Sequence, residues 1–145
     1  MVMGISYLKT TKTMNFIGVT IRKINISGRG KKESITPKIY NKQILTLHRK
    51  LKKLDEKIST TYVIERDNHK NKFHAHLLIN YENENNIYNQ LSRFIGGNIW
   101  KEREERLQTI YGCYGKYGEV DTHLIYDEKG FTGYLNKHEQ INTLI

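Results

Sequence analysis

The chain has a single cysteine, Cys113, among its 145 residues. One cysteine excludes an intramolecular disulfide and a cysteine-based zinc cluster. No apolar run approaches the roughly 20 residues that a membrane-spanning helix requires. The first 13 residues also lack the long apolar stretch of a signal peptide. These absences predict a protein of the cytoplasm, or of the nucleus in a eukaryotic host, with no membrane partner.

Acidic residues are also scarce compared with basic ones. The chain has 24 lysines and arginines against 15 aspartates and glutamates, a net charge of +9 with histidine neutral. Such an excess predicts a polyanionic partner. Nucleic acid is favoured over a lipid surface, since the pattern leaves no apolar helical face to insert into a membrane. The length and the 37% hydrophobic content indicate one folded domain over residues 1–145.

A histidine pair stands in the clearest strand pattern of the sequence, residues 73–79. Apolar residues occupy alternate positions there, so Phe73, Ala75 and Leu77 share one face of the strand. His74 and His76 therefore point together to the other face. Two imidazoles that project into one space can bind one divalent metal ion. The alternative is a pair of half-exposed histidines on the wet face of a sheet.

The remaining periodicity predicts an α+β fold around a central five-stranded antiparallel sheet with flanking helices. The expected strands are 15–22, 60–66, 73–79, 98–101 and 119–126, and the expected helices are 36–57, 83–95 and 131–140. Residues 103–118 have no clear period and predict a loop or a distorted hairpin. The tyrosines in this stretch either pack or stack on unpaired bases; they are Tyr111, Tyr114 and Tyr117.

An acidic residue precedes the histidines on the expected neighbouring strand. Residues 60–66 and 73–79, joined by a short polar turn, predict an antiparallel hairpin. Glu65 can then lie across from the histidine strand. Whether it shares their face depends on the register, which the sequence leaves open.

Two further groups of polar residues are candidates for contact with a substrate. Arg22 ends the first strand, and a glycine-containing loop follows with Arg29, Lys31 and Lys32. These cations either bind nucleic-acid phosphates or lie in a solvated surface loop.

Near the end of the chain, Tyr134, Lys137 and His138 fall on one face of the expected last helix. A phenol near cationic groups is more readily ionised and can act as a nucleophile toward phosphorus. The alternative is a packed tyrosine beside an exposed lysine.

In this order, the motifs resemble the HUH endonuclease superfamily, whose hallmark is His-hydrophobic-His followed downstream by a catalytic tyrosine. More narrowly, the chain is similar to single-tyrosine replication initiator (Rep) proteins of small circular single-stranded DNA viruses and plasmids. His74 and His76 match the second motif of these proteins, and Tyr134-Leu135-Asn136-Lys137 matches the third. Residues 16–20 lie where the loosely defined first motif lies. Glu65 is placed like the third metal ligand.

The resemblance implies an HUH/Rep nuclease fold that nicks and joins single-stranded DNA site-specifically to initiate rolling-circle replication. It implies that His74, His76 and Glu65 bind Mg²⁺ or Mn²⁺. Tyr134 would attack the scissile phosphate and form a 5′-phosphotyrosyl link, while Lys137 positions the phosphate or stabilises charge. The implied partner is single-stranded DNA, with an origin hairpin and a host helicase as further candidates. Monomer or dimer is left open.

The chain departs from the family pattern in two places. His138 stands where many members carry an acidic residue that can approach the metal, so we expect it just outside the ligand set. No Gly-x-x-x-x-Gly-Lys phosphate loop of a helicase is present.

Three other functions remain open from the sequence. One is a single-tyrosine transposase or relaxase on the same fold, and another is a non-catalytic nucleic-acid-binding module. The third is a metal-dependent hydrolase of small phosphoesters, which leaves the positive charge unexplained.

Overall fold

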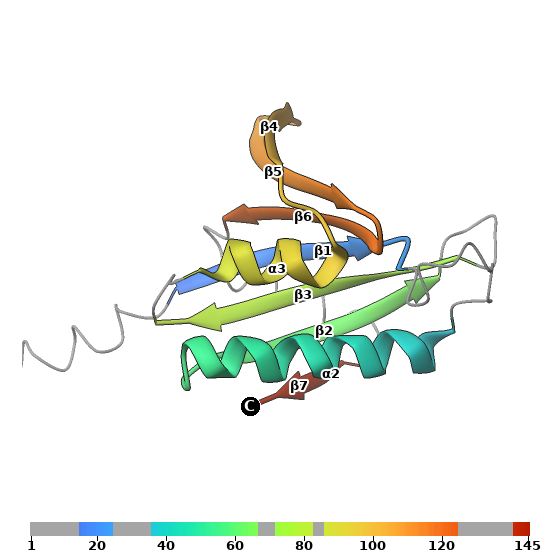
Figure 1. Cartoon of the computed structure of the whole chain (residues 1–145), viewed down its shortest axis with the longest axis vertical. Coiled ribbons are helices and arrows are strands. Elements are labelled where there is room, and N and C mark those ends of the chain that lie inside the picture. Colours follow the sequence, from blue (N-terminus) through green and yellow to red (C-terminus); the bar gives the residue numbers. More distant parts are fainter. Residues whose placement is uncertain (1–14, 25–35, 67–71, 83–85, 125–140) are drawn as a thin grey trace, which may run out of the picture.

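The computed structural model describes residues 15–24, 36–66, 72–82, 86–124 and 141–145. Within them the fold is α+β, with two helices and a seven-stranded antiparallel sheet of order β4-β5-β6-β1-β3-β2-β7 (Figure 1). The strands are β1 (Asn15–Arg22), β2 (Ser59–Arg66), β3 (Phe73–Tyr81), β4 (Trp100–Glu105), β5 (Gln108–Gly115), β6 (Gly118–Leu124) and β7 (Asn142–Leu144). The helices are α2 (Pro37–Leu54) and α3 (Ile87–Ile95).

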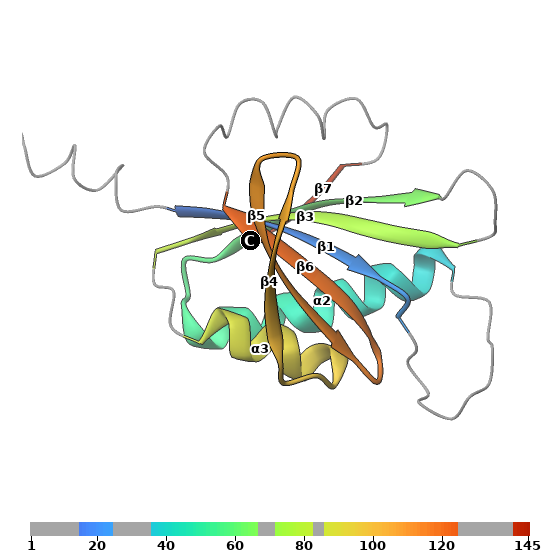
Figure 2. The same cartoon turned by 90° about the horizontal axis from the view of Figure 1, so that it is seen from above.

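Both helices pack on the same face of the sheet, here called the helix face (Figure 2). Alternation along the central strands supplies its apolar residues, because every second side chain of a strand points to one side. The apolar stripe of α2 packs against them at spacings of three and four. The buried core includes Ile17, Val19, Ile21, Ala75, Leu77 and Ile79 from the sheet, with Ile44, Leu47 and Leu51 from α2.

The opposite face carries His74 and His76 and is here called the histidine face. A small separate cluster, Val63 and Leu78 with the half-buried Phe16 and Ile141, packs there. Among the described residues, apolar burial on this face is limited to one end, and polar side chains follow along the central strands.

The sheet differs from the predicted five strands. Residues 100–105 and 108–115 form a regular antiparallel hairpin, β4–β5, where the sequence predicted a short strand and an irregular stretch. This hairpin extends beyond the helices at one edge of the sheet (Figure 1). The three residues of β7, paired with β2, were not predicted. The prediction failed for β4 because every residue after Trp100 is charged, so neither face shows an apolar period. It failed for β7 because three residues are too few to show a period.

Two of the three predicted helices lie within the described residues, and both were correct in type but differ at their ends. α2 begins after Thr36 as predicted and ends at Leu54, three residues early, where Asp55 follows in an extended conformation. α3 begins at Ile87 rather than at residue 83, and ends as predicted at Ile95. Gly96 follows it with a left-handed φ of 69°. The helix predicted over residues 131–140 lies outside the described residues.

None of the described helices combines the length and apolar character needed to cross a bilayer.

Candidate metal centre and polar face of the sheet

The register of β2 against β3 places Glu65 directly opposite His74. Directly paired residues of an antiparallel sheet point to the same face, so the carboxylate and the imidazole project together. His76 is two residues further along β3 and shares that face. The register that the sequence left open is therefore the one that brings all three side chains together.

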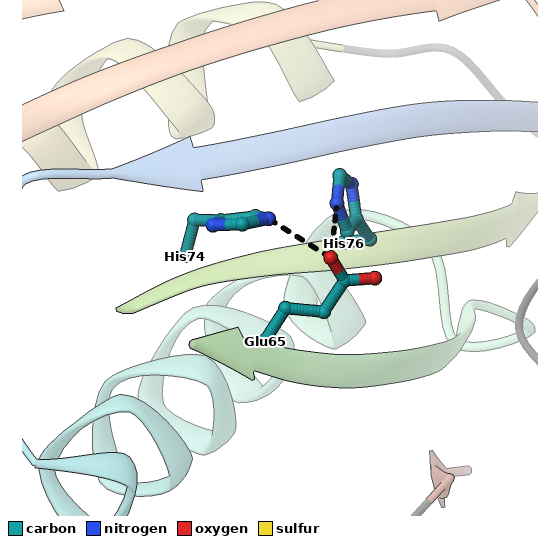
Figure 3. Close-up of side chains that lie close together, drawn as sticks. All are labelled: Glu65, His74 and His76. Atoms are coloured by element: carbon teal, nitrogen blue, oxygen red, sulfur yellow. Dashed lines mark hydrogen bonds and ion pairs between the residues drawn. The ribbon is translucent and has the colours of Figure 1, made fainter. Parts of the chain in front are cut away.

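The three side chains converge on the Glu65 carboxylate (Figure 3). Its Oε2 lies 3.2 Å from His74 Nε2 and 3.6 Å from His76 Nε2. The two imidazole rings are nearly perpendicular, with centroids 4.8 Å apart. Each side chain is 16–20% exposed. The group is thus shielded by the sheet and still open on one side to a ligand.

These distances fit a divalent ion. Two donors bound to one ion at about 2.1 Å lie about 3.0 Å apart in an octahedral site and about 3.4 Å apart in a tetrahedral one. The three donor atoms lie within 4.8 Å of one another, so small side-chain rotations bring them to these separations. Two imidazoles and one carboxylate leave coordination positions for water or substrate, as catalytic sites require. The mixed donors suit Mn²⁺ or Zn²⁺ better than Mg²⁺, which prefers oxygen ligands.

Thr20 supports this group from the neighbouring strand β1. It pairs with His76 across the sheet, and its hydroxyl Oγ1 lies 3.2 Å from His76 Nδ1. When Nδ1–H donates to this hydroxyl, the lone pair of the ring resides on Nε2, the nitrogen nearest Glu65. The contact is therefore compatible with a metal ion bound through Nε2 of His76.

A second polar cluster lies on the histidine face two strands away from His74. Asp121 of β6 accepts hydrogen bonds from Arg103 Nη1 at 3.0 Å and Nη2 at 3.1 Å. Arg22 Nη1 donates to the same carboxylate at 3.0 Å. The Arg103 guanidinium also donates to Glu105 and to the Tyr114 hydroxyl, both at 3.3 Å. The hydrogen bonds to Asp121 are the main cause that raises the pKa of Arg103 above its already high value.

The backbone at Gly112 makes room for this cluster. A Cβ at that position would lie 2.7 Å from Asp121 Oδ1 and 3.0 Å from Arg103 Nη1. The absence of a side chain lets the carboxylate and the guanidinium lie flat on the sheet.

Of the residues predicted to form the site, the structure brings together Glu65, His74 and His76, with Arg22 directly opposite His74 on β1. The others lie outside the described residues; they are Tyr134, Lys137, His138, Arg29, Lys31 and Lys32.

No motif in the sequence indicated Thr20, Arg103 or Asp121 as site residues. Arg103 and Asp121 are 18 positions apart on strands that are not neighbours, so no local motif indicates their contact. The signal available was alternation in β6, which places Glu119, Asp121 and His123 on one face. Burial lowers the pKa of His123, and the charge of Asp121 opposes this effect.

Comparison of the chain with protein-family models, curated proteins and solved structures gave no match.

Proposed function

We propose that this protein is a metal-dependent endonuclease and strand transferase acting on single-stranded DNA, with an HUH/Rep nuclease fold. The observation that carries the proposal is the convergence of Glu65, His74 and His76 on one point of the sheet. The net charge of +9 adds the expected affinity for a polyanion. The biological role that agrees with this activity is initiation of rolling-circle replication.

The strand arrangement supports the family assignment that the sequence suggested. The histidine strand β3 lies in the interior of the sheet between β1 and β2. β1, which contains the segment similar to the first motif, pairs along its whole length with β3. The two segments would therefore act side by side on one face.

A divalent ion bound by the three side chains would polarise the phosphoryl oxygens of a DNA phosphate and stabilise charge as it develops. The residues of the chain supply the remaining chemistry. The Tyr134 oxygen would attack phosphorus, forming the O–P bond of a 5′-phosphotyrosyl link while the bond to the leaving 3′ oxygen breaks. The leaving oxygen takes up a proton and becomes a 3′-hydroxyl, and the reverse reaction joins ends. Lys137 would stabilise negative charge near the phenol.

The chain length allows Tyr134 to reach the histidines. Ile141 packs in the cluster of Val63 and Leu78 on the histidine face, and Val63 pairs with His76. Tyr134 is seven positions before Ile141, and an extended chain of seven residues spans about 23–25 Å. The segment is therefore long enough for Tyr134 to reach the metal ligands, as the proposal requires.

The metal is tested first, without any assay of activity. We expect Mn²⁺ to raise the melting temperature of the protein, because an ion that binds only the native state stabilises it by mass action. At 100 times the Kd the gain is about 2.7 kcal/mol. The variant His76→Ala should lose this shift, and His48→Gln, which changes a histidine of the helix face, should keep it. A shift that survives in His76→Ala would place the metal elsewhere.

The chemistry is tested with a pool of single-stranded oligonucleotides of randomised sequence, labelled at the 3′ end. A 5′-phosphotyrosyl link retains the 3′ part of the strand, so the label should migrate with the protein on a denaturing gel in Mn²⁺. Tyr134→Phe should form no adduct, whereas Tyr117→Phe should form it at the wild-type level. An adduct in Tyr134→Phe rejects the assigned nucleophile. Tight binding with no adduct in the wild-type protein indicates a non-catalytic binding module.

A further inference from the structure

Arg22 stands at the border of the candidate metal centre. Its Cα pairs with His74 on one side and with Glu119 on the other. The side chain is 45% exposed. Within the described residues it donates one hydrogen bond, from Nη1 to Asp121. The guanidinium therefore keeps N–H donors directed to solvent beside the histidines.

Arg103 is bound very differently. All three of its guanidinium nitrogens donate to side chains: both Nη atoms to Asp121, Nη1 also to Tyr114, and Nε to Glu105. The two parallel hydrogen bonds to Asp121 fix the plane of the carboxylate, since bidentate pairs are geometrically specific. Asp121 is 14% exposed and has little freedom to move. The hydrogen bonds of Arg103 therefore serve to fix the Asp121 carboxylate rather than to bind a ligand.

The carboxylate in turn restrains Arg22. Oδ2 of Asp121 accepts from both arginines, at 3.1 Å from Arg103 Nη2 and 3.0 Å from Arg22 Nη1. Arg103 is paired with both Asp121 and Glu105, so the cation of this cluster that stays largely exposed is Arg22. Arg22 is also the member nearest His74, because β1 lies next to β3.

We propose that Arg22 binds a backbone phosphate of the strand held at the metal centre, and that Asp121, locked by Arg103, positions it for this contact. The inference rests on the proposed function, because it assigns a phosphate-binding residue to the same site. Asp121 and Arg103 are positioning residues in this scheme, and Arg22 touches the substrate. A guanidinium already oriented by a carboxylate loses less side-chain entropy when it binds phosphate.

The direction in which one substitution changes the affinity for single-stranded DNA tests the proposal. Asp121→Asn removes a negative charge, so electrostatics alone predicts tighter binding of single-stranded DNA. If Asp121 positions Arg22, the same change weakens binding, by about fivefold, because the loss of the charge-assisted hydrogen bonds releases both arginines. Glu56→Gln makes an equal change in charge just after α2, and should leave binding equal or slightly tighter. Binding is measured by fluorescence anisotropy in EDTA, with the randomised oligonucleotide pool.

The salt dependence of DNA binding distinguishes a loss of Arg22 positioning from a general loss of protein stability. Each phosphate contact to single-stranded DNA contributes about 0.7 to the slope of log K against log salt. Arg22→Gln should lower the slope by about that amount, and Asp121→Asn in the Arg22→Gln background should lower it no further. Arg49→Gln, on the exposed surface of α2, is the matched arginine control. If Asp121→Asn does not fold, Arg103→Lys replaces it, because lysine keeps the charge and cannot make the bidentate pair.

The outcomes distinguish this inference from the proposed function. Tighter or unchanged binding by Asp121→Asn, or an unchanged slope in Arg22→Gln, overturns the role of the cluster and leaves adduct formation by Tyr134 intact. The expected binding results without an adduct overturn the nuclease and retain the phosphate site. A wild-type protein that binds no single-stranded DNA overturns both.

Discussion

At the scale of single residues, the hydroxyl of Thr20 lies where it can hold the ring of His76 in place. The side chain is 8% exposed and Oγ1 lies 3.2 Å from His76 Nδ1. Groups that orient a metal-binding histidine in this way contribute substantially to affinity, because they fix the tautomer and the ring.

Thr20→Val should therefore weaken Mn²⁺ binding by about tenfold while the sheet stays folded. The valine has nearly the same shape and lacks the oxygen, and Thr20→Ser should restore most of the affinity. Isothermal titration calorimetry measures the Kd directly, with Thr46→Val on α2 as the control. Equal affinities for Thr20→Val and wild type would show that this hydroxyl does not orient the histidine.

The residues of the site differ in how well the sequence predicts them. His74 and His76 were assigned to one face of one strand because a period of two fixes their direction. The position of Glu65 depended on the register between two strands, which the three-dimensional packing decides. Asp121 and Arg103 meet across an intervening strand, so only the full sheet brings them together.

At the scale of elements, the end of α3 is joined tightly to the strands β5 and β6. The amide of Tyr117 donates to the carbonyl of Ile95 at 2.8 Å. Gly115 lies under this contact, where an added Cβ would meet the backbone oxygen of Ile95 and the nitrogen of Gly97, the latter at 2.6 Å. Backbone atoms cannot move aside as the tips of side chains can, so this glycine is required by close approach.

Two alanine substitutions in β5 should therefore differ in cost. We expect Gly115→Ala to lower the free energy of unfolding by about 3 kcal/mol, at the upper end for overpacking. Gly112→Ala should cost less, about 1 kcal/mol, because its Cβ meets side-chain atoms of Asp121 and Arg103, whose displacement breaks hydrogen bonds and moves no backbone. Urea denaturation of the two variants measures the difference. A larger loss for Gly112→Ala than for Gly115→Ala would contradict this account of the junction.

The elements themselves were predictable in proportion to their burial. β1 was predicted with its observed ends. One of its two faces packs in the core, and its β-branched residues favour a strand. β4 has no buried residue, so its charged sequence carries no apolar period even though it pairs regularly with β5. A strand with two exposed faces carries no apolar pattern in its sequence, because backbone hydrogen bonds to the neighbouring strand hold it in place.

At the scale of the whole molecule, the sheet separates the apolar core on one face from the candidate metal ligands on the other. The helix face buries nearly all of the described apolar core, and the histidine face carries the candidate ligands and the arginine cluster. Histidines occur on both faces and should behave differently in acid. His48 of α2 is 4% exposed on the helix face and lies 2.9 Å from the Thr60 hydroxyl.

Burial lowers the pKa of His48 below 6.5; the backbone of Ile145 opposes this shift, and the charge of Lys52 adds to it. The native protein then binds fewer protons here than the unfolded chain, so stability is fully present above about pH 6.5 and falls as acid is added. Removing the imidazole in His48→Gln should flatten the dependence of the unfolding free energy on pH below about 6.5. His74, His76 and His123 are present in both proteins and cancel in the difference. Urea melts of both proteins across this pH range measure it, and parallel profiles would mean that protonation of His48 does not contribute to acid unfolding.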